Sequence, residues 1–576
     1  MTPRTPPIHI PTPKTTIPTE STIDTRTKGA RVQQCAPQWN TTIQDMQASG
    51  FHSRDLQLVK TALREGVRIE TTSQPDLVSL PNTPAVRRNI ALCKERIAYY
   101  YDIGALELLT ERPELLQPLH VVDRPGRKAR MVLDLSRNLN DLIDRESFHM
   151  QSIQSAVQLS SPGCFYGKID ISDCFLSFPV HEDSRHYLAF ELDGSFYRFK
   201  RLPFGLSSAP LWTDRFLQCI DFALHKAGIS HVRYCDDFLF IAPSATALRE
   251  ALHTAISILV SHGLVINPDK TEGPSQSIQF LGLGLDSREQ VLFVPEDKVQ
   301  ELLRLSGDMN AREFTHKRHL QSLVGKFSFV AAALPGARPF FRKLIDATRG
   351  RLSPYAKIQV SAEMREDLSM WSRFLNCWNR RARWTSGEPF VLIHDSSKEG
   401  FGFYLGDTPP SFDFAQLPLE LRPGRGFAGY FSAPDLALVQ HSIQWGELFA
   451  IACSLAVYGP FLKDSHVQVL TDNITDMFII RKQSTACPRL LALLRCIYLT
   501  CAHYNIHLTT EHIAGELNTT ADHFSRPALH KHNAHYTHPT TNESFDIHFI
   551  LSSSFQQPTD PSLPPTFSFR PSSLWA

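Results

Sequence analysis

Two adjacent aspartates, Asp236 and Asp237, interrupt an otherwise apolar and aromatic segment, "HVRYCDDFLFIAP", which runs from His231 to Pro243. The pattern of this segment predicts a buried β-hairpin. Burying one unpaired carboxylate costs free energy, and burying two like charges together costs more unless a cation offsets them. The segment therefore predicts a metal site at a hairpin. The alternative is an ordinary turn in which both aspartates face solvent.

The composition limits the class of protein to which this chain can belong. Its 576 residues suggest several domains, at about 150 residues each. A net charge of +1 gives no global positive field, so any contact with nucleic acid must come from local basic patches. The eleven cysteines form no C-x-x-C pair, which argues against a zinc ribbon or disulfide scaffold and favours a reducing compartment. Because no signal-peptide core and no run of about 20 apolar residues occurs, we expect an intracellular protein of the cytoplasm or nucleus, with no membrane partner.

Shifts in composition and in hydrophobic periodicity divide the chain into six segments. Apolar residues at i, i+3 and i+4 predict helices from residue 52 to about residue 116, whereas short β-type runs alternate with helical ones after that. The predicted segments are a disordered Thr/Pro-rich arm (1–40), a helical N-terminal region (41–116), an α+β region (117–295), a second helical region (296–387), an α/β region (388–528) and a low-complexity tail (529–576).

A third carboxylate belongs with the aspartate pair. The apolar stretch "GKIDISDCF" predicts a strand that ends at Asp170. If this strand is a neighbour of the hairpin in one sheet, the carboxylates of Asp170, Asp236 and Asp237 converge. Oxygen ligands of this kind suit Mg²⁺, which proteins usually hold with one or two carboxylates together with substrate phosphates. Two such ions about 3.5–4 Å apart form the clamp used in phosphoryl transfer.

The segments around these aspartates resemble the motifs of reverse transcriptases, in the same order. "YCDD" resembles the Y-x-D-D box, "DISDCF" the first palm motif, and "RLPFGLSSAP" the L-P-x-G motif. "RKARMVLDLSRNLN" looks like the fingers strand pair, and "GLVINPDKTEG" and "FLGLGLD" resemble the motif that follows and the primer-grip hairpin. The resemblance implies an α+β, right-hand polymerase with an antiparallel palm sheet, whose fingers and palm span 117–295 and whose thumb and connection span 296–387.

The same resemblance implies roles for individual residues. Asp170 and Asp236 would hold two Mg²⁺ ions, with Asp237 in support, and Mn²⁺ could substitute. Phe175 would collide with the 2′-hydroxyl of a ribonucleotide, unless it is an ordinary core residue. The other implied substrate-binding residues are Arg130 and Lys128 or Arg127 at the triphosphate, Phe204 and Gly205 in the nucleotide pocket, Tyr234 of the box, and Lys270, which would neutralise or protonate the leaving pyrophosphate.

A second set of carboxylates lies after residue 388. Asp395 and Asp472 end the predicted strands "FVLIHDSS" and "VQVLTDN", Glu447 lies near the start of a long apolar helix, and Asp522 lies at the start of another helix. Carboxylates at strand ends and helix starts are how a two-metal nuclease site is assembled. The pattern therefore predicts a second metal site.

The segments of this second set resemble RNase H domains of retrotransposons. "HIAGELNTTADHFSR" is similar to their H-x-x-G-x-x-N-x-x-A-D-x-x-S-R ending, and "SIQWGELFAI" and "LTDN" are similar to segments of DIRS-type and gypsy-type elements. The resemblance implies an α/β RNase H-like domain in which Asp395, Glu447, Asp472 and Asp522 bind two further Mg²⁺ ions. His512 would belong to a loop that helps product leave or orients water, although a plain surface histidine is the alternative.

Together these patterns predict a retrotransposon RNA-directed DNA polymerase with RNase H activity, similar to DIRS-type elements. Its implied partners are an RNA template, a DNA primer, an RNA–DNA hybrid and dNTPs. The alternative is a domesticated or decayed element that binds nucleic acid without catalysis, and the presence of all seven carboxylates argues against it. The basic stretch "RRARW" either tracks a phosphate backbone or is a solvated linker. Residues 403–440 look like an insertion of unknown purpose.

Overall fold

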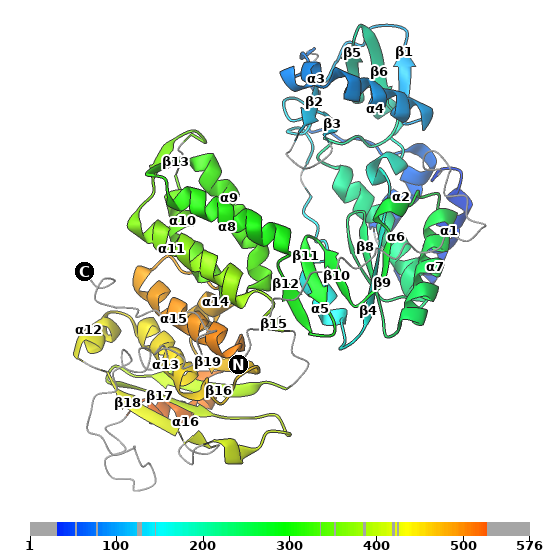
Figure 1. Cartoon of the computed structure of the whole chain (residues 1–576). Helices are drawn as coiled ribbons and strands as arrows, with labels where there is room; N and C mark the ends of the chain where they lie inside the picture. Colours follow the sequence, from blue (N-terminus) through cyan, green and yellow to red (C-terminus); the bar gives the residue numbers. More distant parts are fainter. Residues whose placement is uncertain are drawn as a thin grey trace, which may run out of the picture. The chain divides into compact units, whose positions relative to one another are not determined.

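The chain divides into two compact units, Met1–Leu281 and Gly282–Ala576 (Figure 1). No helix among the described residues is both long enough and apolar enough to cross a membrane. The predicted tail and residues 1–31 of the predicted disordered arm lie outside the described residues. The prediction of disorder up to residue 40 is wrong for its last residues, because helix α1 (Ala36–Ala48) begins there and buries Trp39 completely. The computed structural model describes residues 32–51, 54–76, 79–123, 129–144, 146–334, 336–350, 353–383, 388–417, 421–422, 426–431 and 433–526.

The first unit is built on an antiparallel sheet with the strand order β7-β8-β4-β9. Its central strand β8 is a continuous apolar run after Asp237, and Ile169 of β4 and Phe238 and Phe240 of β8 are fully buried. Helix α7 packs on β4 and β8, and α1 packs on α6. The bounds are β4 (Phe165–Asp170), β7 (His231–Tyr234), β8 (Asp237–Ala242), β9 (Glu272–Ser275), α5 (Ile153–Leu159), α6 (Ala209–Lys226) and α7 (Ala245–Ser261), with α1 (Ala36–Ala48) and α2 (Arg54–Glu65) before them.

A second group of elements in this unit combines the predicted fingers strand pair with elements of the predicted helical N-terminal region. It contains a three-stranded sheet of order β1-β6-β5 and a two-stranded ribbon of β2 and β3. The bounds are α3 (Pro84–Arg88), α4 (Ile90–Asp102), β1 (Leu106–Leu109), β2 (Leu119–Val122), β3 (Arg130–Leu133), β5 (Ala189–Leu192) and β6 (Ser195–Phe199). Short 3₁₀ turns (Cys174–Ser177, Glu182–Leu188 and Pro268–Lys270) and β10 (Ser277–Phe280) complete the unit.

The prediction that helix continues to about residue 116 is wrong after Asp102. Gly104 has a φ of +69°, a conformation that glycine adopts without strain and that stops the helix. The following residues form β1, which pairs antiparallel with β6 so that Leu106 faces Phe199. Pairing with a strand about 90 residues away along the chain overrides the local helical pattern.

The second unit begins with small strands and a helical region. Residues 296–387 were expected to be helical, and the long helices α8, α9 and α11 confirm this. In their core the rings of Phe327 and Trp371 stack with centroids 4.0 Å apart. The bounds are β11 (Leu283–Asp286), β12 (Val291–Phe293), α8 (Glu296–Asn310), β13 (Phe314–His316), α9 (Lys317–Val330), α10 (Arg342–Ala347), β14 (Lys357–Gln359), α11 (Ala362–Arg373) and β15 (Ala382–Arg383).

The rest of this unit is a five-stranded sheet of order β18-β17-β16-β19-β20. β16, β17 and β18 are antiparallel, whereas β16, β19 and β20 are parallel. Helix α13 is apolar on every side and packs between the sheet and α15, as expected for a buried helix. The bounds are β16 (Phe390–Ser396), β17 (Gly400–Leu405), β18 (Gly426–Tyr430), α12 (Ala433–His441), α13 (Ile443–Tyr458), β19 (His466–Thr471), α14 (Ile474–Lys482), α15 (Pro488–Tyr504), β20 (His507–His512) and α16 (Thr519–Phe524).

These elements confirm the predicted fold class. The first unit has an antiparallel sheet covered by helices, as expected for the palm of an α+β polymerase fold. The mixed sheet and its helices form the RNase H-like α/β domain predicted after residue 388. Within the second unit a buried ion pair joins this domain to the helical region, because Arg495 Nη2 lies 2.5 Å from Asp367 Oδ1.

Candidate functional site

The palm strands bring the first three carboxylates to one end of the sheet. Asp170 and Asp237 are register partners on β4 and β8. Asp236 lies in the two-residue connection between β7 and β8, where Cys235 has a φ of +52°, as the tight turns of hairpins require. The backbone N–H of Ile171 donates to the carbonyl oxygen of Asp236 at 3.2 Å. The turn is therefore tied to the end of β4.

Burial, with mutual repulsion in second place, disfavours the charged forms of this carboxylate group. Burial, together with the charges of Asp236 and Asp170, raises the pKa of Asp237 to about 6. Burial and the charge of Asp170 also raise the pKa of Asp236. Because these shifts disfavour the charged forms, a bound cation would stabilise the ionised group.

Two polar side chains hold Asp170, which is only 5% exposed. Lys270 Nζ lies 2.8 Å from Oδ1, and Asn267 Nδ2 donates to Oδ2 at 3.2 Å. Burial lowers the pKa of Lys270, but the hydrogen bond to Asp170 and the charges of Asp237 and Asp236 outweigh this effect and raise it. Lys270 is therefore held as a cation beside the carboxylates.

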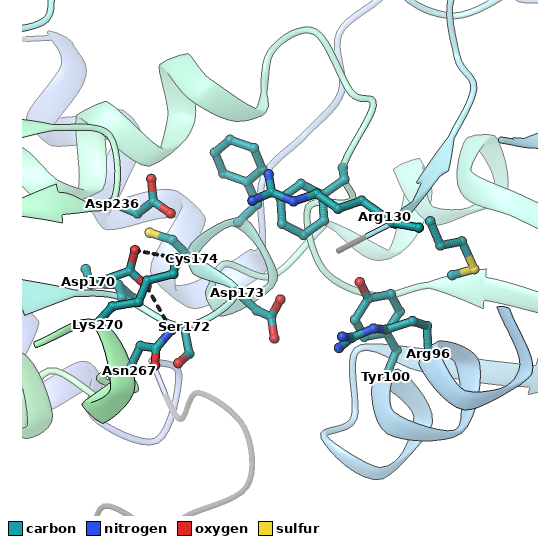
Figure 2. Close-up of a pocket in the computed structure, with 15 residues that line it drawn as sticks. Arg96, Tyr100, Arg130, Asp170, Ser172, Asp173, Cys174, Asp236, Asn267 and Lys270 are labelled. Carbon is teal, nitrogen blue, oxygen red and sulfur yellow. Dashed lines mark hydrogen bonds and ion pairs between the residues drawn. The ribbon is translucent and has the colours of Figure 1, made fainter. Parts of the chain in front are cut away.

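A pocket of about 260 Å³ opens beside these groups. Figure 2 shows Asp170, Asp236 and Lys270 on one side of it and Arg96 on the other, while the side chain of Arg130 reaches across from the side of Arg96 toward Asp236. The rings of Phe175 and Phe204 also line the pocket, with centroids 5.3 Å apart. The lining residues are Arg96, Tyr100, Ala129, Arg130, Met131, Asp170, Ile171, Ser172, Asp173, Cys174, Phe175, Phe204, Asp236, Asn267 and Lys270.

Two other predicted binding residues, Tyr234 and Gly205, do not line this pocket. Tyr234 ends β7 with 39% of its surface exposed. Gly205 has a φ of +113°, and a Cβ there would collide with the carbonyl oxygen of Leu133, so this glycine permits a close approach to β3. Lys128, like Arg127, lies outside the described residues.

The pocket residues that escaped the sequence prediction include Asp173, Asn267, Arg96 and Tyr100. Asp173 and Asn267 belong to segments that the sequence singles out, "DISDCF" and "GLVINPDKTEG", but no role was predicted for them. Arg96 and Tyr100 come from α4. The polar side chains of such a helix are expected to contact solvent rather than to line a pocket. Nothing in the local pattern of α4 indicates that it lines a pocket.

The RNase H-like domain gathers the second set of carboxylates. Asp395 lies on β16 and Asp472 directly follows β19, and because these strands are parallel neighbours their carboxyl ends meet at one edge. Glu447 comes from the start of α13, which packs on β16. Carboxylate oxygens of Asp395, Glu447 and Asp472 lie within 4.8 Å of one another, which among the described residues makes them the one group of three with the spacing of metal ligands.

This group is buried and short of partners. Glu447 Oε1 accepts from the N–H of Ser396 at 3.1 Å, but its Oε2 is buried without a hydrogen bond. Burial, with the charges of Asp395 and Asp472, raises the pKa of Glu447 well above its ordinary value. Burial also raises the pKa of Asp395 to about 6, and the charges of Asp472 and Asp522 add to the effect. An orphaned oxygen and uncompensated charge are features that a metal ion would satisfy.

The structure places Asp522 and His512 at the margin of this group. Asp522 is 47% exposed and pairs with Arg526, whose Nη2 lies 2.6 Å from Oδ1. It is not part of the group within 4.8 Å, although its charge reaches Asp395. His512 is exposed at the end of β20, and its Nε2 lies 3.1 Å from the carbonyl oxygen of Asp472.

A further acidic residue, Asp476, was not predicted. It lies in the first turn of α14, is fully buried, and neither of its carboxylate oxygens has a hydrogen-bond partner. Burial and the charge of Asp472 raise the pKa of Asp476 to about 8. Burying a carboxyl group without a partner costs free energy. In the sequence, the only signal for Asp476 is its position four residues after Asp472.

Comparison with known proteins identifies one segment of the chain. Residues 123–285 match the family model described as "Reverse transcriptase (RNA-dependent DNA polymerase)". The Gag-Pro-Pol polyprotein of Human T-cell leukemia virus 3 (strain Pyl43) is 24% identical over 432 residues, which are 71% of this chain and 28% of that protein. The retrovirus-related Pol polyprotein from transposon gypsy of Drosophila melanogaster is 23% identical over 375 residues, 64% of this chain and 34% of that protein.

A solved structure of a foamy viral protease-reverse transcriptase in complex with RNA/DNA hybrid is 16% identical. The similar region covers 82% of this chain and 62% of the chain in that structure, with a TM-score of 0.48. The chain spans about a third or less of the length of the two polyproteins named above. Residues 123–285 form a reverse transcriptase domain related to those of retroelement and viral polyproteins.

Proposed function

We propose that this chain copies RNA into DNA and cleaves the RNA strand of the resulting hybrid, as part of a DIRS-type, gypsy-related retrotransposon. The register pairing of Asp170 with Asp237 carries the polymerase half of this proposal. Asp170 and the neighbouring Asp236 line a pocket that Arg130 also lines, within the segment that matches the reverse transcriptase family.

The residues of the α/β domain fit a divalent metal ion by the spacing of their carboxylate oxygens, whereas in the palm the support is the gathering of three carboxylates at one end of the sheet and their raised pKa values. In the palm, Asp170 and Asp236 would be the direct ligands and Asp237 the supporting one. In the RNase H-like domain, the ligands would be Asp395, Glu447 and Asp472, with Asp522 joining them when its pair with Arg526 opens. When bound, Mg²⁺ or Mn²⁺ would supply charge stabilisation at the attacked phosphate and lower the pKa of the attacking hydroxyl or water.

The residues of the polymerase pocket divide the remaining tasks. Arg130 would bind the triphosphate of a dNTP through charge-assisted hydrogen bonds. Lys270 would leave Asp170 as the substrate binds and donate to the leaving pyrophosphate. Phe175 packs against Phe204 at the pocket wall and would exclude a 2′-hydroxyl.

The RNase H-like domain would act on an RNA–DNA hybrid. Its recognition would depend on the shape of the hybrid and on the 2′-hydroxyls of the RNA strand rather than on base sequence. His512 would take part in the release of product. The buried, closely spaced carboxylates of this domain favour catalysis over the alternative of a decayed element that only binds nucleic acid.

Two substitutions in the full chain separate the proposed activities. Extension of oligo(dT) on poly(rA) and cleavage of a labelled hybrid are measured for wild type, Asp236→Asn and Asp472→Asn. Asp236→Asn should lose extension and keep cleavage, and Asp472→Asn should do the reverse. If Asp236→Asn extends the primer as wild type does, the polymerase assignment fails, and if Asp472→Asn still cleaves, the nuclease assignment fails.

A further inference from the structure

Helix α4 contributes an arginine to the nucleotide pocket. Arg96 lines the pocket together with Arg130, although it lies outside residues 123–285 that match the family model. We propose that Arg96 is a second guanidinium ligand for the polyphosphate of the incoming nucleotide and that it favours triphosphates over shorter phosphate chains. This inference rests on the proposed polymerase function.

The charges around the pocket leave Arg96 available for a ligand. Lys270 is already bonded to Asp170, at 2.8 Å. Within the part of the chain that the structure describes, neither Arg96 nor Arg130 is ion-paired with a carboxylate. An unpaired guanidinium that faces a cavity is suited to bind phosphate oxygens, because its donors form a planar fork.

The arrangement of the pocket also suits an extended anion. Figure 2 shows Asp170 and Asp236 on one side and Arg96 on the other, with Asp173 and the guanidinium of Arg130 between them. If the reacting phosphate lies at the two metal-binding carboxylates, the rest of the phosphate chain extends toward the arginines. A nucleoside monophosphate would not reach across, so Arg96 would distinguish ligands by the length of the phosphate chain.

The register of α4 fixes where Arg96 points. Cys93, Ile97 and Tyr100 are buried at positions i, i+4 and i+7, so one face of the helix is held in the core of the first unit. The Tyr99 hydroxyl donates to Asp173 Oδ2 at 3.0 Å, which anchors the same turn of the helix to the palm. Arg96 is therefore presented from a packed helix rather than from a loop, and a preorganised ligand loses less entropy on binding.

The alternative is a purely structural role for Arg96. Its guanidinium carbon lies 6.0 Å from the centroid of the Tyr99 ring, which is at the outer limit of a cation–π contact. Such a contact would make substitution of Arg96 lower the unfolding temperature without changing the binding of nucleotides. The two roles therefore differ in what they predict.

Single-nucleotide incorporation by the full chain tests this inference. Arg96→Gln should raise KM for dTTP about tenfold and change kcat less than about twofold, as expected for losing one charge-assisted hydrogen bond in the ground state. Arg96→Lys should lie between Arg96→Gln and wild type. Arg88→Gln is the matched control, because it removes one positive charge from an exposed position on α3, and it should behave as wild type.

A binding measurement isolates the recognition of the phosphate chain. With a dideoxy-terminated primer on an RNA template, affinities for dTTP, dTDP and dTMP are compared in the presence of Mg²⁺. Wild type should prefer dTTP, and Arg96→Gln should lose most of that preference. If wild type extends primers but Arg96→Gln keeps a wild-type KM and preference, or only its unfolding temperature changes, the inference about Arg96 fails alone. If wild type neither extends primers nor binds dTTP, the proposed function itself fails.

Discussion

Asp170 on β4 and Asp237 on β8 are register partners in the antiparallel palm sheet, and the turn that follows β7 places Asp236 beside them. A slip of one residue in this pairing would turn Asp237 to the opposite face of the sheet. The two-residue turn at Cys235 and Asp236 fixes the register. The carboxylate site of the palm therefore depends on the geometry of one hairpin.

Substitution of Cys235 tests the dependence on this turn. Cys235 has a φ of +52°, which a β-branched residue tolerates poorly and glycine adopts freely. Cys235→Val should lower the free energy of unfolding by about 1–2 kcal/mol and reduce primer extension, whereas Cys235→Gly should retain both. Denaturant unfolding monitored beside extension checks this, and equal behaviour of the two variants would contradict it.

Phe175 should exclude ribonucleotides. Its ring lines the pocket against Phe204, so a smaller side chain would leave room for a 2′-hydroxyl. Phe175→Ala should raise the incorporation of rUTP relative to dTTP by about tenfold or more, whereas Phe175→Tyr keeps the bulk of the ring and should not. Competition between the two nucleotides on one template measures the ratio. An unchanged ratio in Phe175→Ala would make Phe175 an ordinary core residue.

Glu447 should link metal binding to the stability of the RNase H-like domain. Its buried Oε2 has no partner, so Glu447→Gln should raise the unfolding temperature in EDTA, because it removes an uncompensated buried charge. The same variant should lose most of the stabilisation that Mg²⁺ gives to wild type. Calorimetry with and without Mg²⁺ measures both effects. An equal gain from Mg²⁺ in wild type and in Glu447→Gln would contradict a role as ligand.

Asp476 should make the stability of the second unit depend on pH. Its pKa in the folded chain is raised to about 8, so the folded state holds the proton more tightly than the unfolded state. Wild-type stability should therefore fall as pH rises from about 4 to about 8, by at most about 1.4 kcal/mol per pH unit for this group.

The variant Asp476→Asn lacks this titration. In EDTA it should differ little from wild type near pH 4 and should be the more stable of the two near pH 9. Asp464→Asn, at an exposed aspartate of the same unit that bonds Asn505, is the control and should follow wild type. A constant difference between Asp476→Asn and wild type across the pH range would show that Asp476 does not titrate as described.

The carboxylate groups could be predicted from the sequence because each lies at the end of an apolar run. Two aspartates between apolar strand residues, as at Asp236 and Asp237, leave few arrangements in which the charge is tolerable. The same reasoning applies to Asp395 and Asp472, because both come at the ends of apolar runs that predict buried strands. In the structure these two strands are parallel neighbours. Local patterns of hydrophobicity were sufficient for these positions.

The walls of the pocket could not be predicted in this way. Arg96 and Tyr100 belong to a helix whose pattern shows only which face is buried, and the identity of its neighbours depends on the tertiary fold. Likewise, the change from helix to strand after Asp102 depends on pairing with β6, which is distant in the sequence. The ion pair of Asp522 with Arg526, one helical turn away, is likewise a contact that the position of Asp522 at a helix start does not indicate.

Incorporation of a single dTTP on an RNA template by the full chain tests the palm site most directly. The experiment compares wild type with Asp170→Asn and with the control Asp102→Asn at matched binding of the primer–template. Asp102 is an exposed residue at the end of α4. Asp170→Asn should bind the primer–template as wild type does and lose at least about 1,000-fold in rate, because the pair of ligands is broken, while Asp102→Asn stays at the wild-type rate. Incorporation by Asp170→Asn within a few fold of wild type would contradict a catalytic role for the carboxylates at the end of β4 and β8.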